Sequence, residues 1–275
     1  MSDLQVRQEP LRIVPTAVAS RPWRALGGKG SLHLVERHAR VYRHLWLMLA
    51  SGIAEPLFYL LSIGLGLGTL VGTVDGVSYT AFVAPALLAT SAMNGAIYDS
   101  TFNVFFLIKY AKTYDAALAT PMSAPDLALG QVLWALIRSA MYALAFTGVM
   151  LALGLFQSYW AIGVLPAAVL TGFAFAAAGM AATTFMRSWQ DFEFVTLVTV
   201  PLFLFSGTFY PLSVYPPAIA VVVECTPLYQ AVALMRGLAL GAVGPGMLWR
   251  VAYLAIMGLA GLYLAGRRVG RLLLT

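Results

Sequence analysis

Uncharged apolar stretches dominate this sequence, and several of them are long enough to cross a lipid bilayer as a helix. Hydrophobic residues make up 60% of the 275 residues and charged residues only 10%, whereas soluble domains are about 25% charged. A helical crossing needs roughly 20 apolar residues, so six crossings use about 120 residues. The composition therefore predicts one all-α polytopic membrane domain and excludes an ordinary soluble globule.

The apolar pattern predicts six transmembrane helices. Between them we expect a short turn around Asp75, a polar loop at 102–125, a tight turn at 154–159 and a second polar loop at 187–193. The predicted spans lie at about 46–72, 79–101, 126–153, 160–185, 194–210 and 247–266.

Basic residues fall mostly on one side of this predicted topology. Fourteen of the 17 Lys and Arg residues lie in the first 43 residues, in the 102–125 and 187–193 loops, or in the tail after residue 266. Cytoplasmic segments of membrane proteins are enriched in Lys and Arg, so we expect both termini in the cytoplasm. The net charge of +6 then reflects topology and implies no nucleic-acid partner.

Two segments precede the first predicted span. Residues 1–30 are basic, contain three prolines and lack an apolar run, which predicts a flexible cytosolic arm before a membrane domain at 31–275. Residues 31–45 show apolar residues at helical spacing opposite a charged face, which favours an amphipathic helix on the membrane surface over a short soluble helix. The apolar face comprises Leu32, Val35, Ala39, Tyr42 and Trp46, and the other face Glu36, Arg37, Arg40, Arg43 and His44.

The apolar segment at 211–246 is the main alternative to a count of six, because LYQAVALMRGLALGA resembles a seventh span. It is short, and it carries Arg236. A seventh span would also move the basic tail to the outside. We therefore predict a re-entrant or interfacial helical hairpin, bounded by Pro216, Pro217, Pro227 and Pro245.

Several kinds of chemistry lack their sequence signatures. GGKGS at 27–31 has the wrong spacing for a Walker phosphate loop. His33, His38 and His44 have no carboxylate pattern for a metal, and Cys225 is the only cysteine, so no internal disulfide forms. We predict no catalytic residue, no metal and no cofactor, and interfacial positions for the histidines.

Two ionisable residues lie deep within predicted spans, where charges are costly and mark function. Glu55 and Arg138 are each twelve residues from the expected cytoplasmic edge of their span (55 minus 43, and 138 minus 126), or about 18 Å. Equal depth permits a pair. Either the pair lines a substrate pathway, or it only stabilises helix packing.

Gly64, Gly68 and Gly72 repeat every four residues in the first predicted span. Such a face lets another helix approach closely, in the same chain or in a second copy.

The order of four segments resembles the type-2 ATP-binding-cassette (ABC) exporter permeases. They are EPLFYLLSIGLGLGTLVG at 55–72, KTYDAALATPMSAPDLALGQVLWALIRS at 112–139, FSGTFYPLSVYP at 205–216 and TPLYQAVALMRGL at 226–238. The resemblance extends over nearly the whole chain after residue 31 and is greatest to nodulation lipo-oligosaccharide exporter permeases and to actinobacterial drug and lipid export permeases.

This resemblance implies six helices after an elbow helix, paired with a second copy or a paralogous permease and with two cytoplasmic ABC ATPase subunits. It implies export of an amphiphilic substrate across the bacterial plasma membrane, among membrane lipids. By similarity, Glu224, Pro227 and Arg236 belong to an external re-entrant hairpin. The residues that receive the motion of the ATPase are Lys112, Tyr114, Asp115, Leu118 and Pro121, with Arg187, Asp191 and Glu193 in a second contact.

Two other classes of function compete with this reading. A proton-coupled carrier or channel should show several intramembrane acids or an internal repeat. An integral-membrane transferase should show a cluster of carboxylates, histidines or metal ligands at one membrane face. The sequence shows neither pattern, and it does not distinguish a drug from a glycolipid as the substrate.

Overall fold

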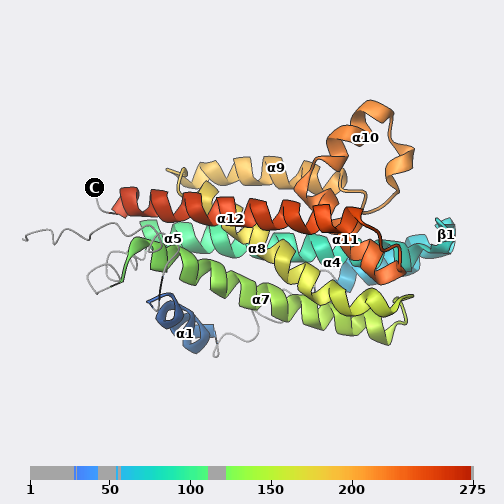
Figure 1. Cartoon of the computed structure of the whole chain (residues 1–275), viewed down its shortest axis with the longest axis horizontal. Helices are drawn as coiled ribbons and strands as arrows, with labels where there is room; N and C mark the ends of the chain where they lie inside the picture. Colours follow the sequence, from blue (N-terminus) through green and yellow to red (C-terminus); the bar gives the residue numbers. More distant parts are fainter. Residues whose placement is uncertain (1–27, 29, 43–53, 55–56, 111–121, 274–275) are drawn as a thin grey trace, which may run out of the picture.

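Helices of the computed structural model, which describes residues 28, 30–42, 54, 57–110 and 122–273, run mostly along one long axis (Figure 1). The chain is mostly helical, as its composition predicts. The elements are α1 Gly30–Tyr42, η2 Ser62–Leu67, α3 Gly68–Val71, β1 Thr73–Val74, β2 Val77–Ser78, α4 Tyr79–Tyr98, η3 Asp99–Asn103, α5 Val104–Lys109, α7 Ala124–Ala152, η4 Tyr159–Gly163, α8 Val164–Thr183, η5 Trp189–Asp191, α9 Phe192–Leu204, η6 Leu212–Val214, α10 Pro217–Glu224, α11 Pro227–Leu240 and α12 Gly246–Leu273.

Four helical stretches in the described residues are long and apolar enough to cross a membrane. They are Tyr79–Lys109, Pro125–Ala152, Tyr159–Thr183 and Gly246–Val269. Helices α10 and α11, bent by 85° relative to each other, add a fifth if they are counted as one span. The first predicted span extends into residues outside the described part, where only Leu57–Val71 is seen as a shorter apolar helix. The fold is therefore that of a polytopic helical membrane protein, with four or five candidate spans in the part of the chain that the structure describes.

Helix α8 is the centre of the bundle, packing against α12, α7 and α4 (Figure 1). Small residues allow these close approaches. A Cβ atom added at Gly172 of α8 would lie 2.9 Å from the Cβ of Ser139 in α7, and one added at Gly261 of α12 would lie 2.7 Å from the backbone of Ala177 in α8. The many alanines and glycines of α8 thus position the helices around it.

The second span extends further than predicted. The helix does not stop at residue 101 but continues through a π-helical turn, η3, and through α5 to Lys109. The predicted loop begins at Phe102, inside the polar run DSTFN at 99–103. Asp99, Ser100 and Thr101 are in fact buried, and an additional π-turn residue lets polar side chains face the bundle interior.

The fifth predicted span extends too far. Helix α9 ends at Leu204 rather than at residue 210. Gly207 has a φ of +70°, which a helix cannot accommodate, and Pro211 follows four residues later (211 minus 207). The final span is longer than predicted, because α12 continues to Leu273 with Arg267 and Arg268 still helical.

A small β-hairpin departs from the all-α prediction. The predicted turn around Asp75 is a two-stranded antiparallel ladder in which Thr73 pairs with Ser78 and Val74 with Val77. Asp75 and Gly76 both have positive φ, 51° and 81°. Asp-Gly with two positive φ angles is a preferred two-residue hairpin turn.

Helix α1 packs on α7 through a side different from its predicted apolar face. Ser31 and Leu34 are buried, and the ring of His38 lies 5.5 Å from that of Trp134. Leu32, on the predicted membrane face, is 62% exposed. This packing leaves Leu32 and Ala39 of the predicted lipid-facing side exposed, whereas Val35 is half-buried.

Gly130 of α7 permits this contact and gives a stability prediction. A Cβ at this position would lie 2.9 Å from both the carbonyl oxygen of Ser31 and the Cδ2 of Leu34. We expect Gly130→Ala to destabilise the fold by about 1–3 kcal/mol, because a backbone atom cannot yield easily. Gly148→Ala, in the same helix with nothing within 4 Å, should instead stabilise it by about 1 kcal/mol. Thermal unfolding of the purified chain in detergent tests both, and equal shifts in one direction would contradict the proposed crowding.

Candidate functional site

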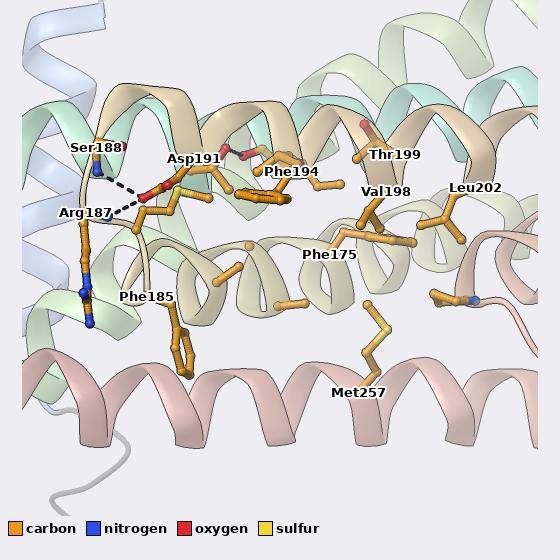
Figure 2. Close-up of a pocket in the computed structure, with 18 residues that line it drawn as sticks. Phe175, Phe185, Arg187, Ser188, Asp191, Phe194, Val198, Thr199, Leu202 and Met257 are labelled. Atoms are coloured by element: carbon orange, nitrogen blue, oxygen red, sulfur yellow. Dashed lines mark hydrogen bonds between the residues drawn. The ribbon is translucent and has the colours of Figure 1, made fainter.

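An elongated cavity of about 850 Å³ lies between α8, α9 and α12 (Figure 2). Its walls are mainly apolar, as Phe175 of α8, Phe194 and Val198 of α9, and Met257 of α12 show. Arg187, Ser188 and Asp191 lie at one end of it, where the chain passes from α8 to α9. The cavity therefore has an apolar length and a polar end.

One face of helix α9 forms a wall of the cavity. Its lining residues recur three or four positions apart, so they lie on one helical face. They are Asp191, which precedes the helix, and Phe194, Val195, Val198, Thr199 and Leu202. The packing partners of α9 are chiefly η5, which precedes it, and α11. Between these neighbours, α9 stands apart from α8 and α12 and leaves the cavity open.

The polar end of the cavity is a tight turn organised by Asp191. The backbone N–H groups of Arg187 and Ser188 donate hydrogen bonds to its Oδ2 at 2.6 and 3.0 Å. These bonds, first that from Arg187, hold the pKa of the Asp191 carboxyl below its usual range, because they favour the charged form. The carboxylate thus supports the turn above its pKa in the unfolded chain, and this support is lost as the pH falls through the lowered folded-state pKa.

A buried ion pair joins α7 to η3. The Nη1 of Arg138 in α7 donates to Oδ1 of Asp99 at the start of η3, and the two side chains are only 9% and 1% exposed. Asn103 also donates to Oδ1 of Asp99 at 2.8 Å, and Arg138 donates to the hydroxyl of Tyr142 at 2.5 Å. Two donors, Arg138 of α7 and Asn103 of η3, therefore converge on one carboxylate oxygen.

Sequence reasoning missed Asp99 as a deep intramembrane acid, because it placed Asp99 two residues from the end of a span (101 minus 99). Aromatic residues could have shown that the helix continues: Tyr98, Phe102 and Phe105 follow each other at steps of four and three. Glu55, the predicted partner of Arg138, lies outside the described residues, so that pairing stays a prediction.

Aromatic rings join the end of the α4–α5 helix to the beginning of α9. The rings of Phe102 and Phe192 stack with centroids 4.1 Å apart. Trp189 of η5 lies against Phe192 at 5.1 Å, and it also approaches Phe105 and Tyr110 at 6.1 and 6.4 Å. We call these five residues the aromatic cluster. It connects the segment that leads into residues 111–121 with one wall of the cavity.

The predicted ATPase-contact residues are only partly described. Lys112, Tyr114, Asp115, Leu118 and Pro121 lie outside the described residues. Arg187 and Asp191 form the turn at the cavity end, whereas Glu193 is exposed in the first turn of α9 and does not line the cavity.

The three residues predicted for the re-entrant hairpin occupy different environments. Glu224 is exposed at the end of α10, and Pro227 begins α11 and lines the cavity. Arg236 donates from Nε to the carbonyl of Phe82 at 3.1 Å and from Nη2 to that of Gly207 at 2.7 Å. Its guanidinium carbon lies 3.7 Å from the centroid of the Phe82 ring. Arg236 thus joins α11, α4 and the bend after α9.

The three predicted packing glycines do not act alike. A Cβ at Gly64 would lie 2.8 Å from Cγ2 of Thr80 in α4, and one at Gly68 would lie 3.1 Å from the Thr80 hydroxyl. The carbonyl of Gly64 also accepts a hydrogen bond from that hydroxyl at 2.7 Å. Gly72 has nothing within 4 Å and a φ of +74°, so it ends the helix instead. Within the described residues, the glycine face meets α4 of the same chain.

Comparison with known proteins identifies a family. A family model described as "ABC-2 type transporter" matches residues 32–240, which is more than half of the chain. Nodulation protein J of Rhizobium leguminosarum bv. trifolii is 37% identical over 190 residues, covering 69% of this chain and 72% of that protein. Nodulation protein J of Sinorhizobium fredii is 31% identical over 224 residues, covering 81% and 86%. The inner membrane transport permease YadH of Escherichia coli is 26% identical over 178 residues, covering 64% and 69%.

These matches confirm the family inferred from the four sequence segments and its similarity to nodulation proteins. The match begins within α1 and ends at the last residue of α11, so it includes the aromatic cluster, the buried ion pair and most of the cavity walls. The chain therefore belongs to the ABC-2 type transporter family, whose members are transport permease subunits and not themselves enzymes.

Proposed function

We propose that this chain is the membrane-spanning subunit of an ABC exporter that moves an amphiphilic substrate out across the bacterial plasma membrane. The substrate class is a lipo-oligosaccharide, a glycolipid, a lipid or a drug. Separate cytoplasmic ABC ATPase subunits supply the energy, and a second copy or a paralogous permease completes the pathway.

The cavity between α8, α9 and α12 is the observation that supports an amphiphilic substrate. Its volume of about 850 Å³ lies in the usual range of small-molecule sites, roughly 300–1,000 Å³. Apolar walls suit an acyl chain or another apolar body, and the turn at Arg187 and Ser188 suits a polar group. An ion pathway would instead be lined by charged groups or carbonyls.

The proposed topology has six spans, an elbow helix α1 and an external hairpin formed by α10 and α11. Helix α1, α5 and the end of α12 lie at one end of the bundle, whereas β1, α10 and α11 lie at the other (Figure 1). Lys109, Arg187, Arg267 and Arg268 belong to segments at the α1 end. The preference of basic residues for the cytoplasmic side supports cytoplasmic termini.

In the proposed mechanism, the ATPase subunits act on the loops at the α1 end. Residues Lys112, Tyr114, Asp115, Leu118 and Pro121 receive their motion, and the turn with Arg187, Asp191 and Glu193 forms a second contact. The aromatic cluster offers a physical path from the first loop to α9, because packed rings transmit displacement. Glu55 and Arg138 form a polar pair beside the pathway.

Purification of the tagged chain together with any ABC ATPase encoded beside it tests this function. We expect the two proteins to co-purify in mild detergent and Asp115→Lys to uncouple or lose the ATPase. Glu224→Lys, a matched charge reversal at the opposite end of the bundle (Figure 1), should leave the association unchanged. ATP hydrolysis and transport of a fluorescent lipid are the measurements.

A proton-coupled carrier is the second candidate, and the buried carboxylate of Asp99 is the observation that favours it. Transport that follows an imposed proton gradient in vesicles lacking any ATPase would support the carrier and refute the exporter. Burial of Asp99 against Arg138 gives its proton no open route among the described residues, which favours the exporter.

A further inference from the structure

The cavity between α8, α9 and α12 carries a cationic rim that the amphiphilic substrate alone does not explain. Arg187 lies at its polar end, and its side chain extends away from Asp191 towards α12 (Figure 2). Asp191 directs its carboxylate at backbone N–H groups of the turn. No carboxylate of the described residues forms an ion pair with the guanidinium of Arg187.

A second arginine lies beside the same end. The guanidinium carbon of Arg268 in α12 is 3.6 Å from the ring centroid of Phe185, which lines the cavity. The Nε of Arg268 is buried and donates to none of the described residues. Arg268 therefore stacks on a ring that lines the cavity at the end where Arg187 lies, and Asp191, the one carboxylate among the described lining residues, is bound by its own turn.

The two arginines lie at one end of the cavity, and the rest of its length is apolar. Met257 lines the cavity, and Arg268 follows it by eleven residues (268 minus 257). Eleven residues are about three helical turns, so the two side chains share a face of α12 and lie about 16 Å apart along it. On α9, Asp191 and Leu202 have the same separation (202 minus 191). Both walls thus run from a polar end to an apolar one.

We infer that this cavity binds one anionic lipid from the cytoplasmic leaflet, with its phosphate between Arg187 and Arg268 and an acyl chain along α9 and α12. Guanidinium groups bind phosphate oxygens through paired, charge-assisted hydrogen bonds. The acyl chain packs against Phe194, Val198 and Met257, which are as apolar as the bilayer it leaves, so the headgroup contacts supply the selectivity. Charge complementarity selects a lipid over a second copy of the chain as the occupant. The inference names a ligand for the site of the proposed function and rests on it only for the transport of that ligand.

Lipid binding by the purified full-length chain tests the inference without any ATPase. Native mass spectrometry would compare phosphatidylglycerol with phosphatidylcholine, which has the same chains but a zwitterionic headgroup. We expect the wild type to prefer phosphatidylglycerol. Arg187→Gln with Arg268→Gln should weaken phosphatidylglycerol binding about tenfold or more, since each lost charge-assisted contact costs a sizeable factor.

Arg267→Gln is the matched control. It removes the same charge one position away, where the guanidinium instead contacts the exposed Tyr263 hydroxyl at 3.1 Å. Binding should stay within about twofold. An equal loss in this control, or no headgroup preference in the wild type, would overturn the inference. Arg187→Gln alone is a further variant. The wild-type Arg187 guanidinium makes no hydrogen bond or ring contact with the described residues, so the fold of this variant should persist.

Two further experiments distinguish a bound lipid from other occupants of the cavity. Val198→Trp fills the cavity and should reduce binding of both lipids, whereas Val200→Trp, at an exposed position that does not line it, should not. If Val198→Trp dissociates a dimer and leaves lipid binding unchanged, a second copy covers the cavity and the inference is wrong. Inorganic phosphate should fail to compete, and full competition would indicate a plain anion site.

Binding and export have separate readouts. Headgroup-selective binding that depends on Arg187 and Arg268 sustains the lipid site even if no ATPase drives transport. Conversely, ATP-driven export with no selective binding refutes the lipid site and leaves the proposed function intact.

Discussion

Arg138→Met is expected to destabilise the folded chain by about 3–5 kcal/mol, because it leaves the buried carboxylate of Asp99 without its counter-charge. Asp99 is 1% exposed and accepts hydrogen bonds from Arg138 and Asn103. For a chain of this size the apparent melting temperature should fall by about 10 °C. Thermal unfolding in detergent, followed by tryptophan fluorescence, measures this effect.

Two controls accompany this prediction: loss of an exposed arginine, and replacement of both members of the ion pair. Arg267→Met removes an exposed arginine and should change stability by no more than about 0.5 kcal/mol. Asp99→Leu combined with Arg138→Met should cost less than Arg138→Met alone, because no charge is then left buried. Strictly additive losses in the double variant would contradict the pair. Glu55→Gln extends the test: a loss that is not additive with Arg138→Met would support the predicted Glu55 partnership.

Trp189→Ala is expected to uncouple ATP hydrolysis from export. Trp189 contacts Phe102, Phe105, Tyr110 and Phe192, so its removal leaves the start of α9 poorly connected to α5. Allosteric coupling typically amounts to about 1–3 kcal/mol, and we expect export to fall about tenfold with ATP hydrolysis nearly unchanged. Export and hydrolysis by the reconstituted complex, measured side by side, give the ratio.

Trp160→Ala is the matched control for this variant. Trp160 is 59% exposed and Trp189 is 53% exposed, but Trp160 belongs to η4 and is not a member of the aromatic cluster. Its replacement should leave the ratio of export to hydrolysis unchanged. If both tryptophan variants lower export equally, or if Trp189→Ala lowers hydrolysis and export together, the aromatic cluster does not transmit motion.

The sequence alone determined the class of this protein. Long runs without charge require a bilayer, since they cannot be covered by the few polar residues present. The family followed from four segments in a fixed order, and the family match over residues 32–240 confirms it. Helix positions were also readable where the apolar run had clear ends: α7 begins two residues before the predicted start of 126, at a Ser123 capping box.

The tertiary structure decided where polar residues lie and how the helices end. The sequence analysis places Asp99 only two residues from the expected end of its span (101 minus 99), and the contact with Arg138 shows why the helix continues beyond it. The bend after α9 depends on Gly207 and on Arg236, a residue 29 positions away. The cavity joins residues from α8, α9 and α12. Periodicity reports which residues share a face of one helix, but it cannot report which other helix that face meets, and the cavity depends on that long-range packing.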